Sequence, residues 1–403
     1  MFRRIDLLLL GITVVLTLFG LAMIASVSVF ESYQLTLRIT GEGNNSFYLW
    51  RTFAHVVLGM CAMLTMAAIP YRIWERYARV MFFGTIILLI LVFIPFFKPA
   101  GAQTSNSWIN LGLMTVQPAE ILKLTLIFYL AVWLQKREQL IGTFKEGFLP
   151  FCTLLMISTV IVAMQPDLGS FFVLSAIAGV MFLIAGGGLI HFFTGAVLAG
   201  SIGLPIILQK EYVRMRFTAF VEILLHPNDV EIKSKICETA GYQICQALLA
   251  IGSGGWSGVG YGKSIQKFGY LPEVQGDMIF AVMAEELGFF RLLIIFMMYG
   301  ILIYRGYRIA ENAPDRFGFL VASGITTWIA VQTLVNMMVN LGIFPLTGLT
   351  LPFISYGGSS LITLLTGVGV LLNISMHSTE EASAARRSKP KPEQGRRWRR
   401  RYA

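Results

Sequence analysis

The segment KFGYLPEVQGDMIFAVMAEELGFF, residues 267–290, joins a polar, glycine-containing loop to a long apolar run. Asp277 lies at the boundary between the two. A carboxylate at the edge of a membrane is costly unless water solvates it, a cation pairs with it or the protein uses it. The 403-residue chain holds only 22 Asp and Glu residues, so the placement of this one is informative.

The composition indicates that the apolar run crosses a membrane. The chain is 56% hydrophobic and only 13% charged, whereas soluble domains are about 25% charged. Runs of roughly the 17 to 25 apolar residues that cross a bilayer are centred near residues 18, 60, 88, 126, 156, 178, 199, 290, 328 and 366. The sequence therefore predicts an all-α polytopic membrane protein with ten transmembrane helices. A large extracytoplasmic loop, about residues 209–277, is expected between helices 7 and 8.

The first apolar run is expected to be a retained helix. It is longer than the apolar region of a usual signal peptide, and no convincing cleavage site follows it. Residues 1–375 are accordingly expected to form a single membrane domain.

The basic residues predict the orientation of this domain. Arg3 and Arg4 and the turns at 71–79, 135–138 and 304–316 all fall on one side if ten helices are counted. The short loops on the other side, at 165–169 and 340–356, contain no Lys or Arg. By the positive-inside rule the basic side is cytoplasmic, and both termini lie there.

Residues 376–403 are expected to form a disordered cytoplasmic tail. Beyond Met376 the chain holds nine Lys or Arg and three Glu, so this segment supplies +6 of the net charge of +10. The clustered charge favours a topology signal that also anchors the tail to anionic lipid, or a docking site for a cytoplasmic partner. No nucleic-acid binding is expected.

Cysteine spacing gives no metal site. Cys237 and Cys245 lie in the extracytoplasmic segment, where a disulfide is chemically allowed. The stretch GYQICQALLAIG, residues 241–252, is typical of an amphipathic helix in which Cys245 is a small apolar residue. This pattern favours unpaired cysteines.

Four carboxylates and a lysine stand out within or beside the apolar runs. Glu120 and Lys123 are three residues apart on one helical face and can pair, either as part of a site or as an ion pair that locks two helices. Asp167 follows a tight link and either caps the next helix or takes part in a site. Glu285 and Glu286 are expected to be partners of polar groups inside the bundle.

Two glycine-containing loops are candidate walls of a cavity. The stretch GSGGWSGVGYGKSIQK, residues 252–267, fails as a phosphate-binding loop because position 257 is Ser where that motif needs Gly. Its glycines are expected to let backbone pack closely or approach a ligand. The stretch GLTLPFISYGGSSL, residues 348–361, is an irregular break between helices, which is tolerated at membrane depth where it lines a cavity.

These motifs together resemble the SEDS family (shape, elongation, division and sporulation), which includes FtsW, RodA and SpoVE. The resemblance rests on residues 241–288 and 348–360, with QPAEILK at 117–123 and QPDLG at 165–169, and it extends over about residues 5–375. The stretch QKFGYLPE is more similar to FtsW and SpoVE than to RodA. The resemblance implies a peptidoglycan glycosyltransferase that polymerises the lipid-linked disaccharide lipid II at the outer face of the plasma membrane, in cell division or in elongation.

The resemblance also implies roles for individual residues. Asp277 matches the essential carboxylate of the family and is the expected general base. The departing pyrophosphate needs cations, for which Arg214, other basic residues or a divalent cation (Mg or Mn) are candidates. The expected substrate-binding residues are Lys263, Lys267, Arg216, Gln266, Glu120, Lys123, Ser355, Gly357, Gly358 and Ser359.

The chain departs from the family pattern at three places, one of which is the unusual stretch VEILLHPND, residues 221–229, after Phe220. Gln275-Gly276-Asp277 stands where HTD is common, which removes a polar neighbour of the expected base. Ser107 precedes Trp108 where an arginine is common, so no role is assigned to that arginine.

Two other functions stay open at this point, a lipid II transporter or flippase and a division scaffold without catalysis. The expected partners are a class B penicillin-binding transpeptidase and other division or elongation proteins, and the expected location is the division septum.

Overall fold

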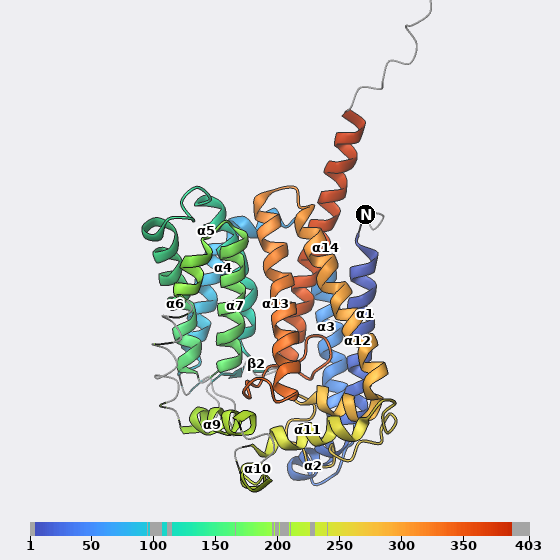
Figure 1. Cartoon of the computed structure of the whole chain (residues 1–403). Helices are drawn as coiled ribbons and strands as arrows, with labels where there is room; N and C mark the ends of the chain where they lie inside the picture. Colours follow the sequence, from blue (N-terminus) through green and yellow to red (C-terminus); the bar gives the residue numbers. More distant parts are fainter. Residues whose placement is uncertain are drawn as a thin grey trace, which may run out of the picture.

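The computed structural model describes residues 5–94, 96, 107–110, 115–165, 167–195, 197, 201, 209, 211–225, 230–239 and 241–388. Long helices run side by side in a bundle, with α2, α9, α10 and α11 at one end and the N-terminus and the end of α14 at the other (Figure 1). The elements are α1 (Leu7–Val27), α2 (Val29–Thr40), α3 (Phe47–Ala68), α4 (Arg72–Leu91), β1 (Ile109–Asn110), β2 (Thr115–Val116), α5 (Pro118–Lys136), the π-helical turn η3 (Phe144–Phe148), α6 (Leu149–Met164), α7 (Leu168–Ile184), α9 (Glu211–Leu225), α10 (Val230–Cys237), α11 (Tyr242–Gly254), α12 (Ile279–Glu311), α13 (Arg316–Asn340) and α14 (Gly358–Ser388).

Seven helical segments in the described part of the chain are long and apolar enough to cross a membrane: α1, α3, α5, residues 144–164, α12, α13 and the first 20 residues of α14. Two more helices stand at predicted runs. One is the apolar, 17-residue α7, and the other is α4, whose first turns carry charged residues. The predicted run near residue 199 falls mostly outside the described residues. The helical class is confirmed, with the two-residue β1–β2 hairpin as an addition.

Aspartates fix the starts of three helices. The side chain of Asp6 accepts from the Leu9 amide at the start of α1, that of Asp167 from Ser170 at the start of α7, and that of Asp315 from Gly318 at the start of α13. A side-chain acceptor satisfies one of the amides that a helix start leaves without an intrahelical partner. The predicted cap at Asp167 is therefore confirmed.

Salt bridges bring the basic turns to one end of the bundle. Arg72 lies 3.0 Å from Asp315, Arg305 lies 2.6 Å from Asp6, and Arg316 lies 3.6 Å from Glu138. These contacts join the starts of α1, α4 and α13 to the ends of α5 and α12. The grouping of basic segments that the sequence predicts is thus observed.

Helix α14 packs along α3 and holds the end of that helix in place. Asn373 of α14 donates to the Ala67 carbonyl at 2.8 Å and accepts from the Tyr71 amide at 2.8 Å. Gly369 allows α14 to approach α3 closely, since a Cβ there would lie 2.3 Å from the Met63 carbonyl oxygen. Helix α13 is largely buried between α5, α7, α12 and α14, and its Trp328 is completely enclosed.

Helix α12 is interrupted at Gly288, whose φ of 74° is left-handed. A side chain there would collide with the Gly258 amide, 2.1 Å from an ideal Cβ. The segment around residue 258 lies along the break, and its Val259 amide donates to the Glu285 carbonyl at 3.0 Å. The glycine-rich loop therefore serves close backbone packing, one of its two predicted uses, and it supplies the hydrogen bonds that the broken helix lacks.

Two expectations are wrong. Cys237 and Cys245 form a disulfide between α10 and α11. The amphipathic pattern of α11 is real, with Ile244 and Ala247 buried, but Cys245 lies beside this buried stripe and faces α10.

The second correction concerns the tail, because α14 continues through Ser388. The predicted start of disorder at residue 376 therefore falls inside a helix. The segment 376–388 contains Glu, Ala and Arg, which favour helix. Residues 389–403 lie outside the described residues.

Candidate active site

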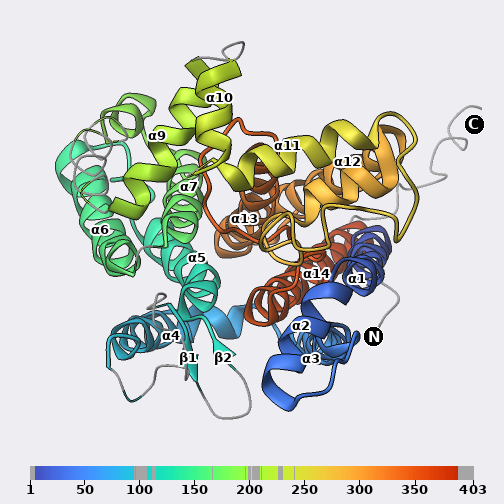
Figure 2. The ribbon, with the colours of Figure 1, turned by 90° about the horizontal axis from the view of Figure 1, so that it is seen from below.

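A cavity of about 1350 Å³ opens at the end of the bundle that carries α2, α9 and α11. Seen from this end, α2, the β1–β2 hairpin, α9 and α11 lie around the loop that precedes α14 (Figure 2). That loop, residues 341–357, lines the cavity as its composition predicts. The polar lining residues include Glu31, Tyr48, Arg51, His55, Trp108, Asn110, Gln117, Glu120, Asp167, Arg216, Gln243, Glu273, Gln275, Asp277, Thr350 and Tyr356.

Asp277 lies in the cavity wall immediately before α12, with 9% of its surface exposed. Its backbone carbonyl accepts from the side-chain amides of Asn336 and Asn340 on α13, at 2.9 and 2.8 Å. Its Oδ1 atom is buried and has no hydrogen-bond partner among the described residues. The main chain of Asp277 is therefore fixed, while its carboxylate remains available to a ligand.

The surroundings of Asp277 raise the pKa of its carboxyl group to near neutral pH. Burial raises its pKa, and the negative charge of Glu273 raises it further, to about 7. The positive charge of Arg216 on α9 acts in the opposite direction. A carboxylate with this pKa can accept a proton near physiological pH, as a general base must.

The loop before Asp277 is held in an unusual conformation. Glu273 has a left-handed φ of 54°, which is costly for a residue with a side chain. The Gln275 carbonyl accepts from the Tyr356 amide at 2.8 Å, which ties this loop to the second cavity wall. On the other side, Gln275 contacts Glu31 of α2, whose pKa is raised by burial and by Glu273.

Glu120 and Lys123 form the predicted ion pair, with 2.6 Å between Oε1 and Nζ. Lys123 is completely buried behind the cavity and also donates to Gln332 at 3.1 Å. Glu120 lines the cavity, and its Oε2 atom is buried without a hydrogen-bond partner in the described structure. The pair thus joins α5 to α13 and presents one carboxylate oxygen to the cavity.

Asp167 contributes a further carboxylate from the start of α7. It accepts from the Gln117 side chain at 2.9 Å in addition to capping its own helix. Burial raises its pKa. Asp167 therefore has both predicted roles, because the residue that caps α7 also lines the cavity.

Arginines, and not the predicted lysines, bring positive charge to the cavity. Arg216 of α9 and Arg51 of α3 both line it. Lys263 is exposed and does not line it. Lys267 is 4% exposed and pairs with Glu286 at 2.9 Å, so it is also absent from the lining.

The Lys267–Glu286 ion pair belongs to a buried network beside α1. Ser26 of α1 donates to Glu286 at 2.8 Å and lies 3.1 Å from the Lys267 ammonium. Glu285 accepts from the Ser264 hydroxyl and from the Ile265 amide, the latter at 3.0 Å. Glu285 and Glu286 therefore partner polar groups inside the bundle, as expected.

Of the other predicted binding residues, two line the cavity and three do not. Gly357 and Gly358 line it, and a Cβ at Gly358 would lie 2.7 Å from the His55 ring. Ser355 accepts from the Leu351 amide at 2.8 Å, within its own loop. Ser359 accepts from the Gln117 amide at 3.1 Å, and Gln266 is buried elsewhere.

Several lining residues were not predicted, above all Glu31, Arg51 and His55. A signal for two of them was present, since Arg51 and His55 are polar residues four apart in an apolar run and so share one helical face. In the described ranges, no three His, Cys, Asp or Glu side chains come together as a metal site.

Comparisons with known proteins agree with these motifs. A family model described as "Cell cycle protein", FTSW_RODA_SPOVE, matches residues 6–380. Stage V sporulation protein E of Bacillus subtilis is 39% identical over 376 residues, which are 93% of this chain and 97% of that protein. A probable peptidoglycan glycosyltransferase FtsW of Geobacter metallireducens is 38% identical over 378 residues, which are 93% and 95% of the two chains.

Solved structures show the same fold. A chain from a structure described as "Structural coordination of polymerization and crosslinking by a peptidoglycan synthase complex" matches with a TM-score of 0.75 at 25% identity, over 94% of this chain and 99% of the other. The rod shape determining protein RodA of Thermus thermophilus matches with a TM-score of 0.65 at 24% identity, over 93% and 97%. The chain is therefore an integral membrane protein, and it belongs to the FtsW, RodA and SpoVE family.

Proposed function

We propose that this protein is a peptidoglycan glycosyltransferase that polymerises lipid II, with Asp277 as the general base. The observation that carries the proposal is the buried Asp277 carboxylate, which lines a large cavity, has a pKa of about 7 and keeps its Oδ1 atom without a hydrogen-bond partner in the described structure. The relatives support the reaction class, since many of them are named probable peptidoglycan glycosyltransferases.

The chemistry requires one base and one set of cations. A sugar hydroxyl of one lipid II molecule attacks the anomeric carbon of another, Asp277 takes the hydroxyl proton, and the bond to the lipid pyrophosphate breaks. Negative charge grows on the departing pyrophosphate, and Arg216 and Arg51 are the cavity cations that can stabilise it. Glu120 and the loop at Gly357 and Gly358 would contact the sugars.

The membrane arrangement is part of the proposal. Ten transmembrane helices would place both termini and the basic end in the cytoplasm and the cavity at the outer headgroup level, where both lipid-anchored substrates can reach it. A class B penicillin-binding transpeptidase is the proposed partner, because a polymerised strand must be cross-linked; one matching structure is described as a complex that coordinates these two activities. The similarity to FtsW favours division and a septal location.

A divalent cation, Mg or Mn, is proposed as an optional cofactor. The unpartnered Glu120 Oε2 atom in the cavity lining fits such an ion, and Mg typically binds through one or two carboxylates together with substrate phosphates. A bound cation would neutralise pyrophosphate charge. Polymerisation by EDTA-treated protein, with and without added Mg or Mn, tests this part.

The deciding experiment is polymerisation of purified lipid II by purified protein, with and without the transpeptidase, followed as glycan chain length on a gel. Asp277→Asn should fold and bind lipid II but polymerise about 10²- to 10⁴-fold more slowly, the usual effect of losing a general base. Glu238→Gln, an exposed carboxylate outside the cavity, is the matched control. A transporter would translocate lipid II without making polymer even as wild type, and near-normal polymer from Asp277→Asn would exclude Asp277 as the base.

A further inference from the structure

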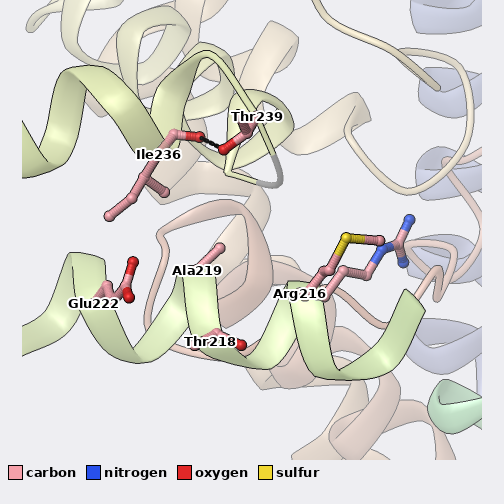
Figure 3. A pocket seen from close by; sticks show the side chains of 7 residues that line it. Arg216, Thr218, Ala219, Glu222, Ile236 and Thr239 are labelled. Atoms are coloured by element: carbon pink, nitrogen blue, oxygen red, sulfur yellow. Dashed lines mark hydrogen bonds between the residues drawn. The ribbon is translucent and has the colours of Figure 1, made fainter. Parts of the chain in front are cut away.

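A second hollow lies between α9 and α10, outside the bundle. It has a volume of about 590 Å³, within the range of about 300 to 1,000 Å³ that is common for ligand pockets. In Figure 3, Ala219 and Glu222 of α9 face Ile236 of α10, and Arg216 stands at the other end. The lining residues are Met215, Arg216, Thr218, Ala219, Glu222, Ile236 and Thr239. We call this hollow the α9–α10 groove.

The α9–α10 groove adjoins the candidate active site at one residue. Arg216 lines both the groove and the 1350 Å³ cavity that contains Asp277. A substrate whose sugar lies beside Asp277 can therefore send a substituent past Arg216 into the groove.

The wall formed by α10 is held in place relative to the cavity. Ile236 is 6% exposed and directly precedes Cys237, whose disulfide joins α10 to Cys245 of α11. Helix α11 in turn supplies Gln243 to the cavity. It packs closely on α12, because a Cβ at Gly254 would lie 2.1 Å from the Ala284 carbonyl oxygen. Disulfide and glycine contact together fix the groove as an extension of the site.

We propose that the α9–α10 groove is the subsite for the peptide stem of lipid II, an inference that rests on the proposed glycosyltransferase function. A stem that is later cross-linked by a transpeptidase must carry a primary amine, which attacks a peptide carbonyl of another stem. The groove offers matching chemistry: Glu222 for the ammonium group, and the Thr218 and Thr239 hydroxyl oxygens, which donate their own protons to main-chain carbonyls, as acceptors for amide N–H groups. Ala219 and Ile236 form an apolar floor for small side chains.

The test compares lipid II with a free stem amine and the same lipid II after acetylation of that amine. Wild type, Glu222→Gln and the control Glu211→Gln are assayed for KM and kcat of polymerisation and for direct binding of each lipid. Glu211 is exposed on the same helix and does not line the groove.

We expect Glu222→Gln to raise the KM and Kd for free-amine lipid II about two- to five-fold, the range for an exposed ion pair, with kcat unchanged. Acetylation should weaken binding to wild type by the same factor and cause no further loss in Glu222→Gln, since both changes remove one interaction. Equal effects on both lipids, or no effect on either, would overturn the groove assignment. If the wild type makes no polymer, the proposed function fails, and the groove is then judged on the binding data alone.

Discussion

Polymerisation by this protein should rise with pH as Asp277 loses its proton. A general base acts only as the carboxylate, and the pKa of Asp277 is about 7. With that value, the ionised fraction is about 9% at pH 6 and about 91% at pH 8, so kcat/KM should increase roughly ten-fold over this interval. An ordinary aspartate would already be fully ionised at pH 6, and the profile would be flat.

The profile should respond to Glu273, because its negative charge contributes to the raised pKa of Asp277. Glu273→Gln should move the midpoint to lower pH, whereas Glu238→Gln should leave it in place. The assay is the initial rate of polymer formation at low lipid II concentration, between pH 5.5 and 8.5, so that kcat/KM reports the free protein. A flat profile, or a midpoint that is the same in wild type and Glu273→Gln, would refute the assignment of Asp277 as a base whose pKa is set by its surroundings.

The same pKa predicts the sign of a stability change. The folded state holds the Asp277 proton more tightly than the unfolded chain, so this group destabilises the fold as pH rises from its ordinary value of 3.8 through about 7. At 1.36 kcal/mol per pKa unit, the destabilisation at pH 8 is at most about 4 kcal/mol. Asp277→Asn should therefore raise Tm at pH 8 more than at pH 4.5. A lower Tm at pH 8 would instead mean that Asn disturbs the fold.

Three further predictions follow from other parts of the molecule. Glu120→Gln leaves the buried Lys123 ammonium without its carboxylate and should reduce the free energy of unfolding by about 3 to 5 kcal/mol; abolished turnover at unchanged Tm would instead place Glu120 in the chemical step. Replacing Cys237 and Cys245 by Ser opens a short loop whose closure contributes about 2 to 3 kcal/mol, so limited proteolysis should cut α10 faster, and equal cutting rates would contradict this. Deleting residues 381–403 should leave polymerisation in detergent intact, and its loss in a folded truncation would show that the tail is needed.

The helices were predictable because their signal is local. A membrane span needs only length and apolar composition, and most predicted runs coincide with helices of the structure. The Glu120–Lys123 pair was equally predictable, since a spacing of three residues on a helix sets the distance between two side chains.

Of the cavity cations, only Arg216 was predicted, and the other positions could not be, because they depend on contacts distant in sequence. Lys267 is only ten residues from Asp277, yet its side chain reaches Ser26, 241 residues away, and pairs with Glu286. Arg51 comes to the cavity from α3, more than 200 residues before Asp277. Proximity along the chain indicated Lys263 and Lys267, which do not line the cavity, whereas the family resemblance indicated Arg216, which does.

The contacts that α12 and α14 make with the start of the chain and with α3 have a consequence for how the protein is made. Asp6 finds its partner Arg305 only after nearly 300 further residues have left the ribosome. The carbonyl of Ala67 waits equally long for the amide of Asn373. Asp6 is therefore paired once α12 is made, whereas the Ala67 carbonyl gains its partner only with α14, the last described helix. The packing of α3 is thus completed only when the end of the membrane domain has been synthesised.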